Sequence, residues 1–305
     1  MTSTVPAATE VADTLPPAEP GLSPRRLWPF VPAAIVLGAL FLAPLSIAVA
    51  ASLWRTSPSL QLIPDWTLDN FRYLLGQAGY IALFGKTLLM AVVVTAAGIT
   101  VAFPFAYFLV RYVSRRWQRI VLLAVVVPFW TSYLVRVYAW QAILGSQGLL
   151  NGLLKELGLI SQPVDVFLYN DVGVFIVLLY VYFPFAALTL YSSLERFDFT
   201  QLTAAQDLGA RPDQALRRVL LPQIRPGLIT ACIFVFIPIL GEYLTPDLVG
   251  GTKGILIGSD IISFYLGGSF PLMAATALLV AVVVLALLIV FRRYLQVEDL
   301  VAGGP

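Results

Sequence analysis

The sequence contains no histidine and only one cysteine, Cys232, which lies inside an apolar run. These absences exclude a disulfide framework and any metal or catalytic site built on histidine or cysteine. We expect Cys232 to act only as a packing residue. An enzyme is therefore disfavoured, and we expect this chain to bind no metal and no cofactor of its own.

Charged residues are scarce as well. Asp, Glu, Lys and Arg make up 12% of the 305 residues, compared with about 25% in a soluble domain. The residues AVILMFWYC make up 59%, which is typical of a membrane protein. The formal net charge of +2 gives no indication of nucleic-acid binding. We therefore expect the lipid membrane, and no nucleic acid, among the partners.

Six apolar segments are long enough to cross a membrane. A hydrocarbon core of about 30 Å needs about 20 helical residues, and runs of this length are too long for barrel strands. We therefore predict an all-α polytopic membrane protein. Its six transmembrane helices are expected over residues 28–54, 86–111, 120–144, 171–195, 227–248 and 270–291.

The two ends of the chain differ from this pattern. Residues 1–24 are rich in Ala, Pro, Thr and Glu and show no hydrophobic periodicity, which predicts a disordered tail. The segment is acidic, and the apolar run that follows Arg25 and Arg26 is too long for a signal peptide, so we do not expect one. The domains are then a membrane domain over residues 25–296 and a C-terminal tail over residues 297–305.

The placement of Lys and Arg predicts the orientation. With the N-terminus inside, thirteen of the 19 Lys and Arg residues fall on the cytoplasmic side and five outside, while Arg136 lies within the membrane. This follows the positive-inside rule. Both termini, and the polar segment between the fourth and fifth spans, are therefore expected in the cytoplasm.

That polar segment, residues 196–227, reads as a helix, a break and a second helix. Asp198 or Thr200 can cap the first helix, whose small face consists of Ala204, Ala205 and Leu208. Gly209 suits the left-handed position that ends a helix. Pro212 suits the first turn of the next, with apolar residues on one side and basic residues on the other: Leu216, Val219 and Leu220 against Arg217 and Arg218. We call this segment, residues 196–227, the knuckle and expect another protein to grip it.

Two charges lie inside predicted spans. Arg136 either marks a functional site, or reaches the outer interface, or pairs with Glu242. Glu242 lies near Pro246 and several glycines, which predicts a broken or terminating helix beside a water-filled cavity. Glu242 and Asp247 could attract a cationic substrate, with the rings of Trp130, Tyr138, Trp140 and Tyr243 stacking on its ammonium groups. The alternative is a helix end with interfacial aromatic residues.

Two other segments have simpler interpretations. Residues 79–87 resemble a phosphate-binding loop, but five residues separate the glycines, the interior is apolar and no strand precedes it. We interpret it as the start of the second span. Residues 148–159 read as a short amphipathic helix that lies at the membrane surface or caps a pore.

The knuckle resembles the EAA loop of permease subunits of ABC importers, whose pattern is Glu-Ala-Ala, three residues, Gly, and a Leu-Pro downstream. Ala204, Ala205, Gly209, Ala210, Leu221, Pro222 and Gly227 fall on the pattern, but Thr203 stands in place of the leading Glu. That replacement removes one expected polar contact. Residues 128–138, 190–196 and 241–251 look like the spermidine/putrescine branch of these permeases, and the likeness extends over about residues 28–295.

The resemblance implies a type I importer fold in the bacterial inner membrane. It implies three partners: a cytoplasmic ATPase dimer that holds ATP and Mg, a second and related permease, and an extracytoplasmic solute-binding protein. It assigns coupling to the ATPase to a set within the knuckle: Thr203, Ala204, Ala205, Asp207, Gly209, Ala210, Arg211, Arg217 and Pro222. The knuckle would turn the fourth and fifth spans in an alternating-access cycle. The expected cargo is a polyamine; an importer of iron, an anion or an opine, or a stand-alone transporter or channel, are the alternatives.

Overall fold

The computed structural model describes residues 31–57 and 59–292. The predicted tails, residues 1–24 and 297–305, lie outside the described residues, as do the basic residues at 25, 26 and 293 that entered the orientation argument. The chain divides into two units, Met1–Ile47 and Ala48–Pro305. The described part of the first is helical and belongs to α2 (Val31–Ser52), and every other described element lies in the second.

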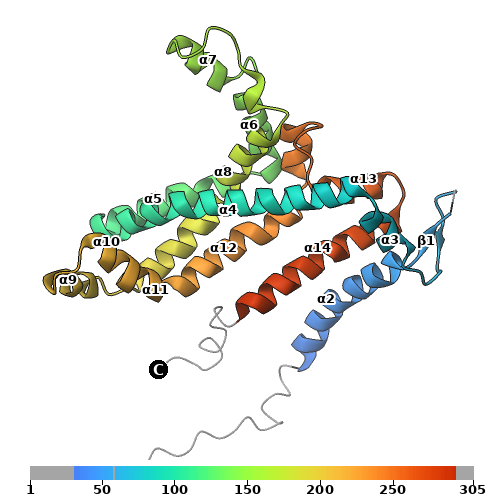
Figure 1. The fold of residues 1–305 in the computed structure, drawn as a ribbon, viewed down its shortest axis with the longest axis horizontal. Helices are drawn as coiled ribbons and strands as arrows, with labels where there is room; N and C mark the ends of the chain where they lie inside the picture. The colour runs from blue at the N-terminus through green and yellow to red at the C-terminus, as the bar shows by residue number, and fades with distance from the viewer. Residues whose placement is uncertain (1–30, 58, 293–305) are drawn as a thin grey trace, which may run out of the picture. The chain divides into compact units, whose positions relative to one another are not determined.

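The second unit consists almost entirely of helices (Figure 1). A two-residue antiparallel ladder joins β1 (Arg55–Thr56) to β2 (Leu62–Ile63). The α-helices are α3 (Asp69–Gly76), α4 (Ala78–Tyr112), α5 (Arg115–Val126), α6 (Tyr133–Leu144), α7 (Leu149–Glu156), α8 (Asp171–Glu195), α9 (Thr200–Asp207), α10 (Pro212–Ala215), α11 (Leu221–Gln223), α12 (Arg225–Leu240), α13 (Ile257–Leu266) and α14 (Phe270–Phe291). Shorter 3-10 helices are η3 (Val127–Trp130) and η4 (Asp165–Phe167), and π-helical turns are η5 (Leu216–Leu220) and η6 (Pro246–Gly250).

The centre of this unit is formed by α4, α8 and α12, each of which packs against the other two. Small side chains occupy the contacts: Ala91, Ala102 and Ala106 of α4 and Ala186 and Ala187 of α8 are fully buried. Lipid is as apolar as the helix surfaces, so close van der Waals packing through small residues holds such helices together. A second cluster, formed by Leu74, Tyr80, Ile257 and Ala275, joins α3, α4, α13 and α14.

Four of the predicted spans are confirmed as continuous helices. α2, α4, α8 and α14 are each long and apolar enough to cross a membrane. α4 begins well before the predicted boundary at residue 86, and residues 79–87 lie inside it. The interpretation of that glycine-containing segment as the start of a span is therefore confirmed.

The prediction of an unbroken third span over residues 120–144 is wrong. The helical run Arg115–Trp130 ends, and the next begins at Tyr133 at an angle of 96°. Pro128 has no amide hydrogen to donate to the helix, and Thr131 and Ser132 adopt extended conformations. The carbonyl of Pro128 instead accepts bonds from the amide and the hydroxyl of Thr131, at 3.3 and 2.7 Å.

The fifth span is shorter than the predicted range of 227–248. α12 runs from Arg225 to Leu240, stops at Gly241, and is bent by 70° from the helical run Pro212–Gln223 before it. The prediction of a terminating helix near Pro246 is confirmed, because the chain resumes only as the π-helical turn η6. Counting each bent pair as one span gives up to six spans in the described residues.

Candidate functional site

The knuckle has the predicted helix–break–helix structure. α9 ends at Asp207, and Gly209 has a φ of +90°, in the left-handed region. Pro212 is the first residue of α10. The carboxylate of Asp198 accepts bonds from the amide and hydroxyl of Thr200, at 2.9 and 2.8 Å, although the position before α9 is Phe199. The π-helical turn η5 that follows α10 was not predicted.

The tip of the knuckle presents a surface of small and polar residues. Most of the predicted coupling residues are exposed: Thr203, Ala204, Asp207, Gly209, Arg211, Arg217 and Pro222, with Ala205 and Ala210 half-buried. Leu208 is 90% exposed beside Gly209. Leu208 was predicted on the small face of the first helix with Ala204 and Ala205, but it was not included among the coupling residues. An apolar residue directly before the helix-ending glycine was the available signal.

Packing and one hydrogen bond between side-chain amides hold the parts of the knuckle together. Leu202, Ala215 and Leu220 are buried, and the side-chain amide of Gln223 donates to that of Gln201 over 2.6 Å. These contacts hold α9 against the helical turns that lead into α12.

Aromatic contacts connect the knuckle to α4. The ring of Phe199 lies 5.9 Å from that of Tyr107 and 5.2 Å from that of Phe197, in both cases edge to face. The guanidinium of Arg111 lies 5.3 Å from the centre of the Phe199 ring. Such ring and cation–π contacts are favourable. A displacement of the knuckle would therefore act on α4 as well as on α8 and α12.

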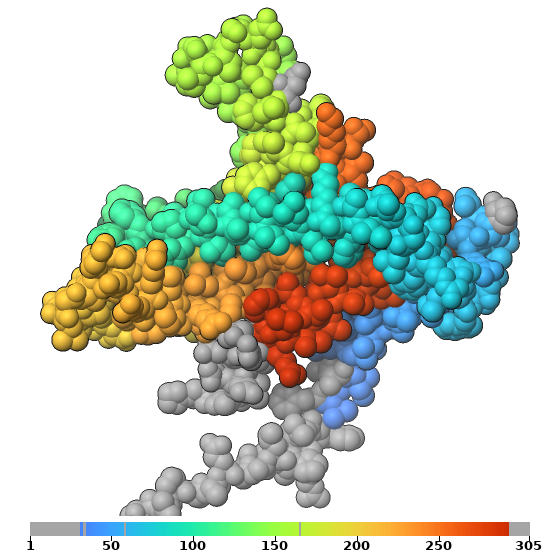
Figure 2. Space-filling view, viewed as in Figure 1, coloured from blue at the N-terminus to red at the C-terminus, as the bar shows by residue number. Residues whose placement is uncertain are grey.

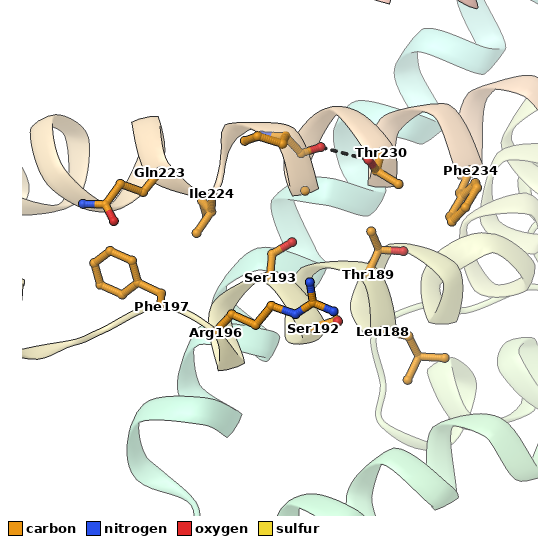
Figure 3. Close-up of a pocket in the computed structure, with 12 residues that line it drawn as sticks. Leu188, Thr189, Ser192, Ser193, Arg196, Phe197, Gln223, Ile224, Thr230 and Phe234 are labelled. Atoms are coloured by element: carbon orange, nitrogen blue, oxygen red, sulfur yellow. Dashed lines mark hydrogen bonds between the residues drawn. The ribbon is translucent and has the colours of Figure 1, made fainter. Parts of the chain in front are cut away.

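A cavity of about 570 Å³ lies between the end of α8 and the start of α12 (Figure 3). Its polar lining comes from Thr189, Ser192, Ser193, Arg196, Gln223 and Thr230. At Gly227 the two helices approach closely, since a Cβ atom there would lie 1.7 Å from Oγ of Ser193. The glycine predicted on the EAA pattern therefore serves close helix packing.

Glu242 lies just beyond the end of α12, and three donors reach its carboxylate. It is 7% exposed, and Oε2 accepts a bond from the hydroxyl of Tyr182 over 3.0 Å. Oε1 accepts from the amides of Leu244 and Thr245 at 3.1 and 3.2 Å. This geometry favours the helix-end alternative, in which Glu242 holds the turn between α12 and η6.

Arg136 does not pair with Glu242 in the described residues. Its guanidinium carbon lies 4.3 Å from the centre of the Phe129 ring and 5.6 Å from that of Tyr133. Its Nε and Nη1 atoms are buried without a hydrogen-bond partner among the described residues. The ion pair with Glu242 that the sequence left open is not formed among the described residues. The carboxylate instead accepts from Tyr182 and two backbone amides.

The remaining pathway candidates are only partly brought together. Tyr243 and Asp247 lie one turn apart, with the amide of Asp247 donating to the carbonyl of Tyr243, and both are exposed. Trp130 is 84% exposed, whereas Tyr138 lines a separate cavity of about 580 Å³ with Gln141. The described residues include no group of three or more acidic or cysteine side chains that could hold a metal.

Comparisons with known proteins agree with this architecture. The family model described as "Binding-protein-dependent transport system inner membrane component" matches residues 95–297. The chain is 36% identical over 229 residues to the spermidine/putrescine transport system permease protein PotB of Escherichia coli K12, covering 75% of this chain and 82% of that protein. It is 36% identical over 252 residues to the inner membrane ABC transporter permease protein YdcU of the same organism, covering 79% and 80%.

A solved structure shows the same fold. One chain of a bacterial ABC transporter that imports the acidic polysaccharide alginate superposes with a TM-score of 0.68 at 18% identity. The match covers 90% of this chain and 97% of that chain.

Proposed function

Since the chain belongs to the family of binding-protein-dependent transport system inner membrane components and is a multi-pass permease subunit of an ABC importer in the inner membrane, we propose that its cargo is a polyamine such as spermidine or putrescine. The identity to PotB over most of both chains supports this cargo. Because the chain belongs to this family, a stand-alone transporter or channel is no longer an alternative. Import of iron, an anion or an opine is the competing assignment.

The proposed mechanism is based on the structure of the knuckle. Its tip is exposed and built from small residues around Gly209, with Leu208 projecting beside it. We infer that this surface docks into a groove of a cytoplasmic ATPase dimer. ATP and Mg would be held there by the ATPase, and the permease would contribute only the docking surface. Small residues permit close approach, and one exposed leucine supplies an apolar anchor.

Transport would proceed by alternating access. Closure of the ATPase dimer would displace the knuckle, which connects α8 to α12 through consecutive short helices. The cavity between α8 and α12 is lined by Arg196, Phe197 and Gln223 at the knuckle's two ends. Its width would therefore change with the position of the knuckle, opening and closing a route for the cargo. Both chain termini would lie in the cytoplasm.

The exposed aromatic and acidic residues suit a polyamine. Asp247 and Tyr243 lie on one turn, and Trp130 and Tyr138 present free ring surface. A carboxylate and aromatic faces attract ammonium groups. In this proposal Glu242 acts indirectly, by holding the turn that carries Tyr243 and Asp247. A second, related permease and an extracytoplasmic solute-binding protein would complete the assembly.

The test is the ATPase activity of the reconstituted complex against a panel of solutes. The complex contains this chain, a second permease, the ATPase and the solute-binding protein. We expect stimulation by spermidine or putrescine and none by iron, sulfate or an opine. Stimulation by one of those solutes alone would remove the polyamine assignment and leave the importer. Failure of any ATPase to co-purify with the chain would remove the docking role of the knuckle.

A further inference from the structure

The break in the third span leaves irregular backbone that this chain does not cover. Trp130, Thr131 and Ser132 are all exposed between η3 and α6. Within the hydrocarbon region, such backbone is tolerated only where protein covers it or where it lines a water-filled cavity. The helical run that begins at Tyr133 is bent by 96° from the run Arg115–Trp130, and the far end of the α6–α7 segment projects away from the other helices (Figure 2). The exposed backbone around the break must therefore be covered by another protein or line a water-filled cavity.

α6 is fixed in position on its other side. The hydroxyls of Tyr133 and Thr245 form a bond of 2.7 Å. The side-chain amide of Gln141 donates to the carbonyl of Leu248 over 2.7 Å. These two bonds hold α6 against η6 and the turn before it, so rotation of α6 cannot bring Arg136 to an acceptor within the chain without breaking them.

Arg136 lies at the edge of the exposed face of α6. Val135 and Ala139 on that face are exposed, and Arg136 itself is half-buried, so part of its side chain remains open to a neighbouring molecule. The small side chain of Ala139 permits close approach. Nε and Nη1 nevertheless have no acceptor among the described residues. A buried polar group without a partner calls for an explanation, and a charge inside a membrane calls for one more strongly.

Three possible acceptors are disfavoured. Glu242 is engaged by Tyr182 and two amides. A polyamine is itself a cation and repels a guanidinium. A lipid headgroup suits an arginine that extends to the interface, whereas the Arg136 guanidinium is held against the ring of Phe129. A carboxylate supplied by a neighbouring protein fits these three constraints.

We propose that Arg136 forms an ion pair with a carboxylate of the second permease subunit, across an interface made by residues 130–132 and the exposed face of α6. The proposal rests on the proposed function in two respects: the presence of a second permease and the cationic cargo. Arginine suits this role because its planar fork can bind a carboxylate through two parallel bonds. Removing one member of a buried pair leaves the other uncompensated.

The first experiment measures association of the two permeases in the full complex. With Arg136→Gln, we expect the second permease to dissociate from the tagged chain at least about tenfold faster than in the wild type. Arg136→Lys should restore part of the association, since it keeps the charge. The control is Arg72→Gln, because Arg72 is exposed and, within the described residues, its ion-pair contact is with Asp69 at 3.6 Å. This variant should leave association unchanged. Monodispersity and helix content of the tagged chain are measured for every variant.

A second experiment begins from a variant that keeps Arg136. Val135 is replaced by photoreactive benzoylphenylalanine, and the cross-linked product is identified by mass spectrometry. We expect a peptide of the second permease that contains or adjoins an Asp or Glu. In the background of Arg136→Glu, replacement of that acidic residue by Arg should restore transport.

The outcomes separate this proposal from the proposed function. Cross-links to lipid only, or unchanged association in Arg136→Gln, would overturn the ion pair. Anion import that depends on Arg136, with association intact, would overturn both the pair and the polyamine assignment. If association depends on Arg136 while wild-type ATPase activity responds to a solute other than a polyamine, the pair stands and the cargo assignment fails.

Discussion

The hydroxyl of Tyr182, in the middle of α8, donates a hydrogen bond of 3.0 Å to Oε2 of Glu242, just beyond the end of α12. Both residues are buried. The bond joins the two helices at the point where α12 stops, and the same carboxylate caps the turn that follows. Glu242, for which the sequence left a cargo contact and a helix-end role open, forms a structural link between two spans.

Replacing Glu242 tests this link. Glu242→Ala leaves one hydroxyl and two amides without their acceptor, and each buried unpaired group costs about 1–3 kcal/mol. We expect a fall in the thermal midpoint of the purified protein by several degrees. Glu242→Gln should cost less, because its amide oxygen still accepts from the backbone, and Tyr182→Phe should cost about 1 kcal/mol. An unchanged midpoint with a raised KM for transport would show that Glu242 contacts cargo instead.

The close approach of α8 and α12 at Gly227 gives a second prediction. A Cβ at this position would lie 2.6 Å from Cβ of Ser193 and closer still to its hydroxyl, so Gly227→Ala must push the helices apart. Overpacking of this kind costs about 1–3 kcal/mol. The double variant Gly227→Ala with Ser193→Gly should recover most of the loss, as measured by thermal unfolding. Equal destabilisation by the single and double variants would place the cause elsewhere.

Gly209 and Leu208 test the docking surface. Gly209→Ala requires an L-residue at a φ of +90°, which costs about 1–2 kcal/mol locally, although a Cβ would meet no atom within 4 Å. Gly209→Trp adds bulk at the exposed tip and should uncouple ATP hydrolysis from transport. Leu208→Ser should reduce the amount of ATPase that co-purifies. If the spans remain folded, normal transport per ATP in Gly209→Trp would contradict the proposal that the knuckle transmits motion from the ATPase to the spans.

The contact between Phe199 and α4 predicts a coupling defect at a distance from the ATPase. Phe199→Ala removes the contacts with Tyr107 and Arg111, so hydrolysis should continue while less cargo moves per ATP. Phe199→Tyr keeps the ring and should restore coupling. The matched control is Phe108→Ala, because Phe108 is exposed on α4 and its ring meets that of Tyr112. Equal cargo per ATP in Phe199→Ala and the wild type would contradict a route through α4.

Much of the knuckle could be predicted from the sequence because its signals are local. A glycine that ends a helix and a proline that begins one act through their own backbone preferences. The structure confirmed both at Gly209 and Pro212. The coupling role of the surrounding residues stays a prediction, since it depends on a partner.

The sequence by itself determined that the chain is a helical membrane protein with a polar knuckle, because span length, composition and helix-ending residues are properties of short segments. Only the tertiary structure showed that the third span breaks between Trp130 and Tyr133 and that α12 ends at Leu240. It also showed that Arg136 and Glu242 differ in their hydrogen-bond partners. From the sequence alone, Arg136 and Glu242 are both charged residues inside predicted spans. Three donors reach Glu242, whereas Nε and Nη1 of Arg136 lack an acceptor in the part of the chain that the structure describes. One of the donors to Glu242, the hydroxyl of Tyr182, reaches it through the packing of α8 against α12, which brings together residues 60 positions apart.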